Sequence, residues 1–414
     1  MKEESIISFD RALQIVLESV VQKDPEIVSI HDAAGRINYL DIVSDINIPS
    51  FDNSAMDGYA IHHTDTKGAS SSMPVHMQIV GEIQAGEKHD TALIKKNTAI
   101  RIMTGAPIPP GADSVIPVEY ASEDEAANTV QIFKEMKLNE NVRFAGEDIT
   151  VGQIIIKNGE RIDSAEIGLL AAINKKEVSV YKKPDVAIIS TGNEIVEVGE
   201  EIITGQVRNT NAYSLASEVK KYNGAIRYVG IAKDELKSTR QIFIKAMDSD
   251  IIISTGGVSK GKYDLVKDVL ADLGVEIVIE KVNMKPGRPI VFGKKGDKIF
   301  FGLPGNPVST LVAFLEFVRP AMLKISGSKK LKKPEIYGIL DDEIKKKESR
   351  KEFIRGHFYI QHNTIHVKST GPQGSGILRS MSDANCLIII PEQSSGGKAG
   401  DNVLIQLIEH EEIY

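Results

Sequence analysis

Cysteine and tryptophan are nearly absent from this chain of 414 residues, which contains one cysteine and no tryptophan. The single thiol excludes an internal disulfide, and it also excludes a metal site built from several thiolates. Cys386 lies in a short apolar run at 385–390, so we expect it to be a buried strand residue. Redox or thiolate chemistry by the protein itself therefore has no residues to support it.

Long apolar runs and an excess of positive charge are also missing. No run approaches the roughly 20 apolar residues of a membrane span, and the N-terminal residues show no apolar segment of signal-peptide type. The formal net charge is −7, so no overall field favours nucleic acid. The most basic stretch, 329–334, lacks interleaved aromatic residues and is expected to be a solvated linker. We therefore expect a cytoplasmic protein without a membrane or nucleic-acid partner.

The length and the changes in residue pattern along the chain predict a multidomain protein. Amphipathic patterns predict one helix at 8–22, capped by Ser8, and another at about 164–174, where Asp163 and Glu166 form a capping box. Short alternating runs between glycines and prolines are typical of β-structure. The expected domains are a discontinuous N-terminal domain (1–46 plus 144–183), an all-β insertion domain (47–143), a central α/β domain (184–327) and a C-terminal β-domain (334–414).

The α/β domain alternates apolar runs with amphipathic segments, which predicts a doubly wound parallel sheet covered on both faces. If the first three strands are ordered 2-1-3, the first and third are neighbours at the topological switch point, where ligands bind. Strands are expected at 186–190, 226–231, 250–254, 275–280 and 299–302, and helices near 211–222, 235–247, 262–272 and 308–324.

The first and third of these strands both end in Ser-Thr-Gly, at 190–192 and 254–256. Backbone amides and hydroxyls at such turns hold phosphate, and nearby carboxylates hold a cation. Glu194 follows the first turn, and Asp264 follows the second as either a helix cap or a metal ligand. The candidate phosphate-binding residues in the two turns are Thr191, Gly192, Thr255, Gly256, Gly257 and Ser259.

Two further segments predict anion binding. Lys281, Lys285 and Arg288 alternate with Met, Pro and Gly, which is unusual for a solvated charge run. The turn that opens the last helix offers Pro304, Gly305, Asn306, Pro307 and Ser309. The histidines, including His62 and His63, have no partners at metal-ligand spacing. Carboxylates and cations around phosphate loops therefore favour Mg²⁺-assisted chemistry on a phosphoanhydride.

Three polar segments belong to the first half of the chain. Residues 51–60, which include Asp57, are too rich in polar groups for a simple hairpin. Thr104 stands at the mouth of a proline-rigid loop at 101–111, for which a purely structural turn is an equal alternative. Asp148 follows a glycine turn that on its own would be read as a solvated loop.

Seven motifs in one order resemble those of the molybdopterin molybdenumtransferases, known as MoeA and as the E-domain of gephyrin. The resemblance runs from about residue 5 to residue 410. The most specific motifs are Phe-Asp-Asn-Ser-Ala-Met-Asp-Gly-Tyr-Ala at 51–60 and Thr-Gly-Gly-Val-Ser at 255–259; the others lie at 103–107, 145–148, 191–194, 285–289 and 303–309.

The resemblance implies an elongated homodimer of four-domain subunits that takes adenylylated molybdopterin and molybdate, cleaves the adenylate and releases AMP. It implies that Asp57, Thr104 and Asp148 of one subunit face the α/β domain of the other. There the resemblance makes Glu194, Asp234 and Asp264 the carboxylates for Mg²⁺, with Asp57, Asp148, Glu194 and Asp264 as the catalytic carboxylates. The anion holders would be Lys281, Lys285, Arg288 and the turn from Pro304 to Ser309.

The sequence departs from the family at Lys260 and Lys262, where a small or apolar and an acidic residue are usual, which leaves the fine substrate preference open. The choice between molybdate and tungstate is also open, because both are tetrahedral dianions of nearly equal size. The molybdopterin adenylyltransferase is a candidate protein partner. Two other functions stay open: a dimeric peptide-binding scaffold of gephyrin type, and an adenylyltransferase that acts on molybdopterin.

Overall fold

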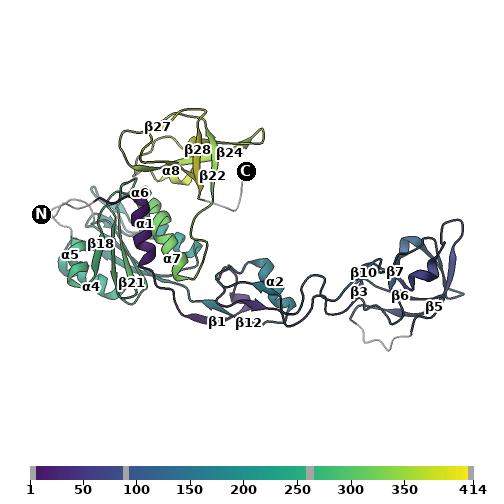
Figure 1. Cartoon of the computed structure of the whole chain (residues 1–414). Helices are drawn as coiled ribbons and strands as arrows, with labels where there is room; N and C mark the ends of the chain where they lie inside the picture. Colours follow the sequence, from purple (N-terminus) through teal and green to yellow (C-terminus); the bar gives the residue numbers. More distant parts are fainter. Residues whose placement is uncertain (1–5, 87–92, 258–264, 409–414) are drawn as a thin grey trace.

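The computed structural model describes residues 6–86, 93–257 and 265–408. The predicted site residues Ser259 and Asp264, and the two lysines at which the sequence departs from the family, Lys260 and Lys262, lie outside the described residues. Figure 1 shows an elongated molecule with an α/β unit and a C-terminal β-unit at one end and an all-β unit at the other. A narrow antiparallel pair, β1 (Pro25–Ser29) with β12 (Glu177–Tyr181), lies between the two ends. Within the described residues, no helix is both long and apolar enough to cross a membrane.

The central sheet of the α/β unit has six strands in the order β16-β13-β17-β21-β20-β18. The predicted 2-1-3 order of the first three strands is confirmed, and five of the six strands point in the same direction. The expectation of a purely parallel sheet is wrong, because β20 pairs antiparallel with both β21 and β18. The strands are β13 (Asp185–Thr191), β16 (Ala225–Ala232), β17 (Ile251–Thr255), β18 (Glu276–Ile279), β20 (Val291–Lys295) and β21 (Lys298–Leu303).

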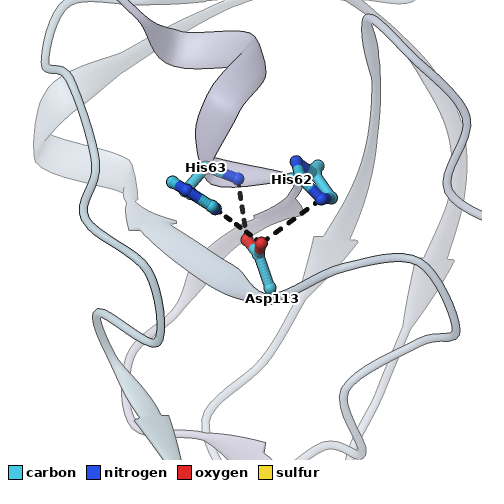
Figure 2. A group of neighbouring side chains, drawn as sticks. All are labelled: His62, His63 and Asp113. Atoms are coloured by element: carbon cyan, nitrogen blue, oxygen red, sulfur yellow. Dashed lines mark hydrogen bonds and ion pairs between the residues drawn. The ribbon is translucent and has the colours of Figure 1, made fainter.

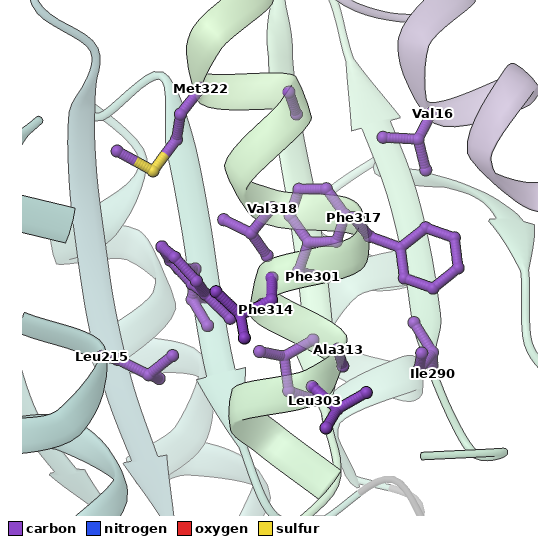
Figure 3. Close-up of a cluster of buried hydrophobic side chains, with 14 of the residues drawn as sticks. Val16, Leu215, Ile290, Phe301, Leu303, Ala313, Phe314, Phe317, Val318 and Met322 are labelled. Atoms are coloured by element: carbon purple, nitrogen blue, oxygen red, sulfur yellow. The ribbon is translucent and has the colours of Figure 1, made fainter. Parts of the chain in front are cut away.

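Helices cover both faces of this sheet, as predicted. Alternate residues of β13 and β17 belong to two separate apolar clusters, since successive strand side chains point to opposite faces. One face packs on α4 (Leu236–Ala246) and α5 (Leu265–Asp272). The other packs on α3 (Thr210–Lys221) and on a continuous helical segment, α6 (Pro307–Ala313), η4 (Phe314–Val318) and α7 (Arg319–Ile325). Figure 3 shows Phe314, Phe317 and Met322 of this segment packed over the sheet.

The first helix, α1 (Phe9–Glu18), is capped by Ser8, whose Oγ accepts a hydrogen bond from the Arg11 amide at 3.4 Å. Its buried residue Phe9 lies against Phe317, with ring centroids 5.2 Å apart. This helix therefore packs on the α/β unit. Phe317 is far from Phe9 in the sequence, so no local pattern indicates this contact.

The rest of the N-terminal unit and the all-β unit occupy the middle and far end of the molecule. The N-terminal unit contains η1 (Ile30–Asp32), β1 and β12, the pair β2 (Ile42–Val43) and β11 (Ile154–Ile156), and α2 (Ser164–Ala172), where the Asp163 amide donates to Glu166 Oε2 at 2.9 Å. The all-β unit has a six-stranded sheet in the order β7-β4-β6-β5-β9-β8. Its elements are β3 (Asn53–Ser54), β4 (Gly58–Ile61), η2 (His63–Thr66), β5 (Val75–Ile83), β6 (Thr98–Ile102), β7 (Ser114–Pro117), η3 (Val118–Tyr120), β8 (Ala121–Asp124), β9 (Thr129–Ile132) and β10 (Val142–Arg143).

The C-terminal unit is a closed β-barrel. Its strands follow the order β24-β25-β22-β28-β26, and the additional pairing of β26 with β24 closes the ring. Cys386 is a buried strand residue as predicted, and burial raises its pKa to about 12. The barrel elements are β19 (Met284–Lys285), β22 (Glu335–Leu340), β24 (Lys351–Gln361), β25 (Thr364–Ser369), α8 (Arg379–Ser382), β26 (Cys386–Ile390) and β28 (Asn402–Leu407), beside the small pair β23 (Ile344–Lys345) and β27 (Gly396–Gly397).

The basic stretch at 329–334 is not a fully solvated linker. Lys333 is only 6% exposed, and its Nζ lies 3.6 Å from a carboxylate oxygen of the buried Glu316. Burial lowers the pKa of Lys333 to about 8, against the opposing attraction of Glu316. The prediction was wrong for this residue because the helical segment that carries Glu316 lies next to it only in the folded chain.

Candidate substrate-binding pocket

A cavity of about 670 Å³ opens at the carboxyl ends of β13, β17 and β21. This is the edge of the sheet at which the strand order predicts a ligand site. The sequence-predicted residues that line it are Thr191, Glu194, Thr255, Gly256, Gly257, Pro304, Gly305, Asn306 and Pro307.

The two Ser-Thr-Gly turns pack directly against each other at the floor of this cavity. Thr191 Oγ1 donates a hydrogen bond to the Thr255 carbonyl at 3.0 Å. Gly256 has φ +89°, and a Cβ at this position would lie 2.5 Å from the Thr191 carbonyl oxygen. Gly256 is therefore required both for the turn and for the close approach of the two backbones.

Glycine also determines where the first carboxylate lies. Gly192 has φ +145°, and a Cβ there would lie 2.6 Å from Glu194 Oε2, so the Glu194 side chain folds back over the turn. The next residue links this turn to the end of β16, because the Asn193 amide donates to Asp234 Oδ2 and the Asp234 amide donates to Asn193 Oδ1, each at 3.2 Å. Glu194 and Asp234 are exposed and lie on adjacent turns, and the third predicted carboxylate, Asp264, lies outside the described residues.

The turn before α6 forms another wall. Pro307 occupies the first turn of α6, and Thr310 Oγ1 donates to the Pro304 carbonyl at 2.5 Å. Asn211 Nδ2 donates to the Gly305 carbonyl at 2.8 Å, which fixes the turn against the start of α3. Ser309 was predicted to belong to the same anion-binding turn. It is instead the buried third residue of α6 and does not line the cavity.

Residues just before α3 complete the cavity, and the sequence analysis missed them. Asn209 is 1% exposed; its Oδ1 accepts from Ser190 Oγ at 2.8 Å, and its Nδ2 donates to the Tyr228 hydroxyl at 2.9 Å. Burial and the nearby Glu197 carboxylate raise the pKa of Tyr228, so its hydroxyl stays protonated. The polar run 208–211, which includes the first two residues of α3, marks this segment in the sequence but does not indicate its hydrogen-bond partners.

The predicted cation segment meets the cavity only in part. Pro289 lines the cavity, and Arg288 Nε is buried without a hydrogen-bond partner among the described residues. Lys285 Nζ instead lies 3.2 Å from Glu352 Oε1, a carboxylate of β24 that is almost fully buried. Lys285 therefore neutralises a buried charge of the barrel, a role that its sequence context did not indicate.

The predicted residues of the all-β unit form a second group, at the other end of the molecule (Figure 1). Asp57 Oδ1 accepts two hydrogen bonds from Thr104, one from its amide and one from its hydroxyl, each at 2.7 Å. These bonds lower the pKa of Asp57, which keeps the exposed carboxylate ionised. Asp52 Oδ1 accepts from the Ala145 amide at 2.8 Å, which ties the same region to the segment that carries Asp148. We call Asp57, Thr104 and Asp148 the distal face.

Comparison with known proteins identifies the family of the whole chain. Three family models match in order: the MoeA N-terminal region (domain I and II) at 7–174, a probable molybdopterin binding domain at 187–324, and the MoeA C-terminal region (domain IV) at 337–408.

Whole-chain relatives agree with these matches. A molybdopterin molybdenumtransferase of Haemophilus influenzae is 36% identical over 98% of this chain and 99% of its own length. One from Nostoc is 35% identical over 93% and 89%. The solved structure of a molybdopterin biosynthesis MoeA protein from Pyrococcus horikoshii superposes with a TM-score of 0.83 at 30% identity, covering 97% of this chain and 100% of that one. The chain belongs to the molybdopterin molybdenumtransferases, transferase enzymes of molybdenum cofactor biosynthesis.

Proposed function

We propose that the pocket binds adenylylated molybdopterin, that the protein transfers molybdenum from molybdate to it, and that the adenylate is cleaved to release AMP. The observation that carries this proposal is the cavity itself, whose floor consists of two glycine turns at neighbouring strand ends. Turns of this kind present backbone amides without side chains in the way, which suits a phosphate group or a tetrahedral dianion.

The substrate must bring the sulfur ligands for molybdenum. Cys386 is the single cysteine of the sequence, and it is buried within the barrel, away from the residues that line the pocket. Molybdenum is therefore cargo bound by the dithiolene of the pterin, and the protein's part is to hold the two substrates next to each other.

Magnesium fits the carboxylates at the pocket. Mg²⁺ prefers oxygen ligands and is commonly held by one or two carboxylates together with substrate phosphates and water. Glu194 and Asp234, exposed on adjacent turns, would hold it with Asp264, and it would neutralise phosphate charge during cleavage of the adenylate.

A second subunit would complete the site. The distal face carries an ionised Asp57 and an orienting Thr104, but it lies at the far end of the molecule from the pocket. We infer a homodimer in which the distal face of one subunit covers the pocket of the other, because a closed site excludes water and positions both substrates.

The direct test is AMP release from adenylylated molybdopterin, titrated with molybdate in the presence and absence of Mg²⁺. We expect release that requires both, and that falls roughly 100-fold or more in Glu194→Gln, as is usual when a charge-stabilising group is removed. Release without molybdate would contradict the transfer reaction. Net adenylylation from ATP and molybdopterin would instead support the adenylyltransferase alternative.

A further inference from the structure

Three side chains of metal-ligand type meet at one end of β4, in the all-β unit (Figure 2). No partner for His62 and His63 is evident in the sequence, but the folded chain brings Asp113 next to them, 50 positions after His63. Antiparallel pairing of Ile61 with Ser114 ends the β4–β7 ladder, and the Asp113 amide donates to the Ile61 carbonyl at 3.0 Å. The residue after β4 and the residue before β7 must therefore lie opposite each other.

Both imidazoles face the same carboxylate oxygen. Asp113 Oδ2 lies 2.6 Å from His63 Nδ1 and 3.4 Å from His62 Nε2. The two rings are stacked, with centroids 5.2 Å apart and an interplanar angle of 22°. All three ligand atoms lie within 4.8 Å of one another, so one ion could reach all three.

The distances can be compared with those around a tetrahedral zinc ion. Ligand atoms about 2.0–2.1 Å from the ion are separated by about 3.3–3.4 Å across the tetrahedral angle. The His62–Asp113 separation already has this value, whereas the His63–Asp113 contact is a hydrogen bond that must open by under ~1 Å and give up its proton. The cluster is therefore close to the geometry that metal binding needs.

Outer hydrogen bonds orient the ligands. Asp113 Oδ1 accepts from the His63 amide at 2.7 Å and from Ser114 Oγ at 3.1 Å, which leaves Oδ2 for the imidazoles. His62 Nδ1 lies 2.8 Å from Thr64 Oγ1, which leaves Nε2 facing the carboxylate. Contacts of this kind fix ring orientation in established metal sites.

The chemistry of the set indicates which ion it suits. Two imidazoles and one carboxylate suit borderline transition ions and differ from the all-oxygen sets that suit Mg²⁺. The side chains of His62, His63 and Asp113 are 44%, 27% and 19% exposed, so water can fill the remaining coordination positions. We propose that these three residues bind a divalent transition ion of zinc type, at the end of β4 opposite to Asp57.

Zinc affinity of the full-length, untagged protein tests the proposal. Excess Mg²⁺ would occupy oxygen-rich sites, and a chromogenic chelator would report Zn²⁺ binding by competition. We expect one equivalent of Zn²⁺ in the wild type and an affinity at least about 10-fold lower in His62→Ala and Asp113→Asn. Co²⁺ in place of Zn²⁺ should give visible absorption bands that both variants lose.

The barrel offers a matched control. His366 Nδ1 lies 3.0 Å from Asp341 Oδ1, which resembles the His63–Asp113 contact. The ring stacked on His366 is the phenol of Tyr359, whereas the ring stacked on His63 is the imidazole of His62, so the barrel pair lacks the second imidazole ligand. Asp341→Asn should therefore leave zinc affinity unchanged. Zn²⁺ should also raise the Tm of the wild type and of Asp341→Asn, and it should leave the Tm of Asp113→Asn unchanged.

Two results would overturn the proposal. The first is a wild-type protein that takes up no zinc and shows no zinc-dependent rise in Tm, which would leave a proton-bridged histidine–aspartate pair only. The second is equal zinc affinity in the wild type and in His62→Ala. The exposed His62 serves as the second variant, because its truncation should not affect folding even if Asp113→Asn does.

Discussion

The pocket and the distal face use similar parts in different ways. Both place a carboxylate beside a glycine turn at the end of a strand, and both hold that turn through a threonine. In the pocket, Thr191 and Thr255 are buried, the backbones touch and a cavity results. On the distal face, Asp57 and Thr104 are exposed, and the Asp57 carboxylate accepts both of its hydrogen bonds from Thr104. The first region is an enclosed cavity, whereas the second is an exposed surface.

Whether the pocket of one subunit works together with the distal face of the other can be tested by inactivating each region in a different subunit. Glu194→Gln and Asp57→Asn should each lower AMP release by roughly 100–1000-fold, since each removes a charge aimed at the reacting groups. Random mixing of the two variants by co-expression should restore about a quarter of wild-type activity, because half the dimers are mixed and each has one intact site.

The control for this experiment is co-expression of Glu194→Gln with Asp234→Asn. Both substitutions affect the same pocket, so no intact site can form and activity should stay low. Recovery in this control, or no recovery in the first mixture, would contradict a site shared between subunits.

A substitution at Gly256 tests whether backbone contact makes the pocket. Gly256→Ala should lower AMP release roughly 100-fold, since displacements near 1 Å have effects of this size. It should also lower the free energy of unfolding by about 1–3 kcal/mol, because φ is positive and the Cβ would overlap the Thr191 carbonyl. The AMP-release assay and chemical denaturation measure the two effects.

Gly81 provides the matched glycine. It lies in β5 with no positive φ, and nothing lies within 4 Å of an added Cβ. Gly81→Ala should leave both stability and AMP release near wild type. Equal effects at the two glycines would show that the contact with Thr191 is unimportant.

A third prediction concerns Lys285, which lies between the pocket and the barrel. Lys285→Met should lower the free energy of unfolding by roughly 1–3 kcal/mol and should also lower AMP release, because it removes the ion pair of the buried Glu352. The double variant with Glu352→Gln should regain most of that stability. If the double variant also regains AMP release, the lysine acts through the barrel. If release stays low, Lys285 also contacts the substrate.

The smallest expected effect is on the distal face. Two hydrogen bonds from Thr104 lower the pKa of Asp57, so their contribution to stability is present above the unfolded pKa and is lost as pH falls through the folded pKa. Thr104→Val removes the hydroxyl bond and keeps the amide bond, which should move the carboxyl titration of Asp57 upward. Carboxyl NMR titration measures this shift, with Thr104→Ser as the control that should titrate like the wild type.

The sequence predicted those parts of the fold that depend on local pattern. Apolar runs ending in Ser-Thr-Gly placed β13 and β17 side by side, and the order of neighbouring strands was confirmed. β20 was missed because its five residues include Gly293 and two lysines, and it is recognisable mainly through its hairpin with β21.

Site residues were harder to predict where partners are distant in sequence. Glu194 and Thr255 follow strand ends, so their convergence was readable. The buried hydrogen bonds of Asn209 and the pairing of Lys285 with Glu352 depend on packing between segments far apart in the chain. No local pattern could indicate them, and the same holds for the approach of Asp113 to the two histidines.

The paired strands β1 and β12 separate the two ends of the molecule (Figure 1). An antiparallel strand advances about 3.4 Å per residue, so adding two residues to each strand would lengthen the pair by about 7 Å. Because side chains alternate with a period of two, each existing side chain would stay on the same face of the pair. Every residue of the pocket and of the distal face would remain unchanged, but the distance between these two regions within one subunit would increase. The distance between the pocket and the distal face of one subunit therefore depends on the length of this strand pair, which contributes no residue to either region.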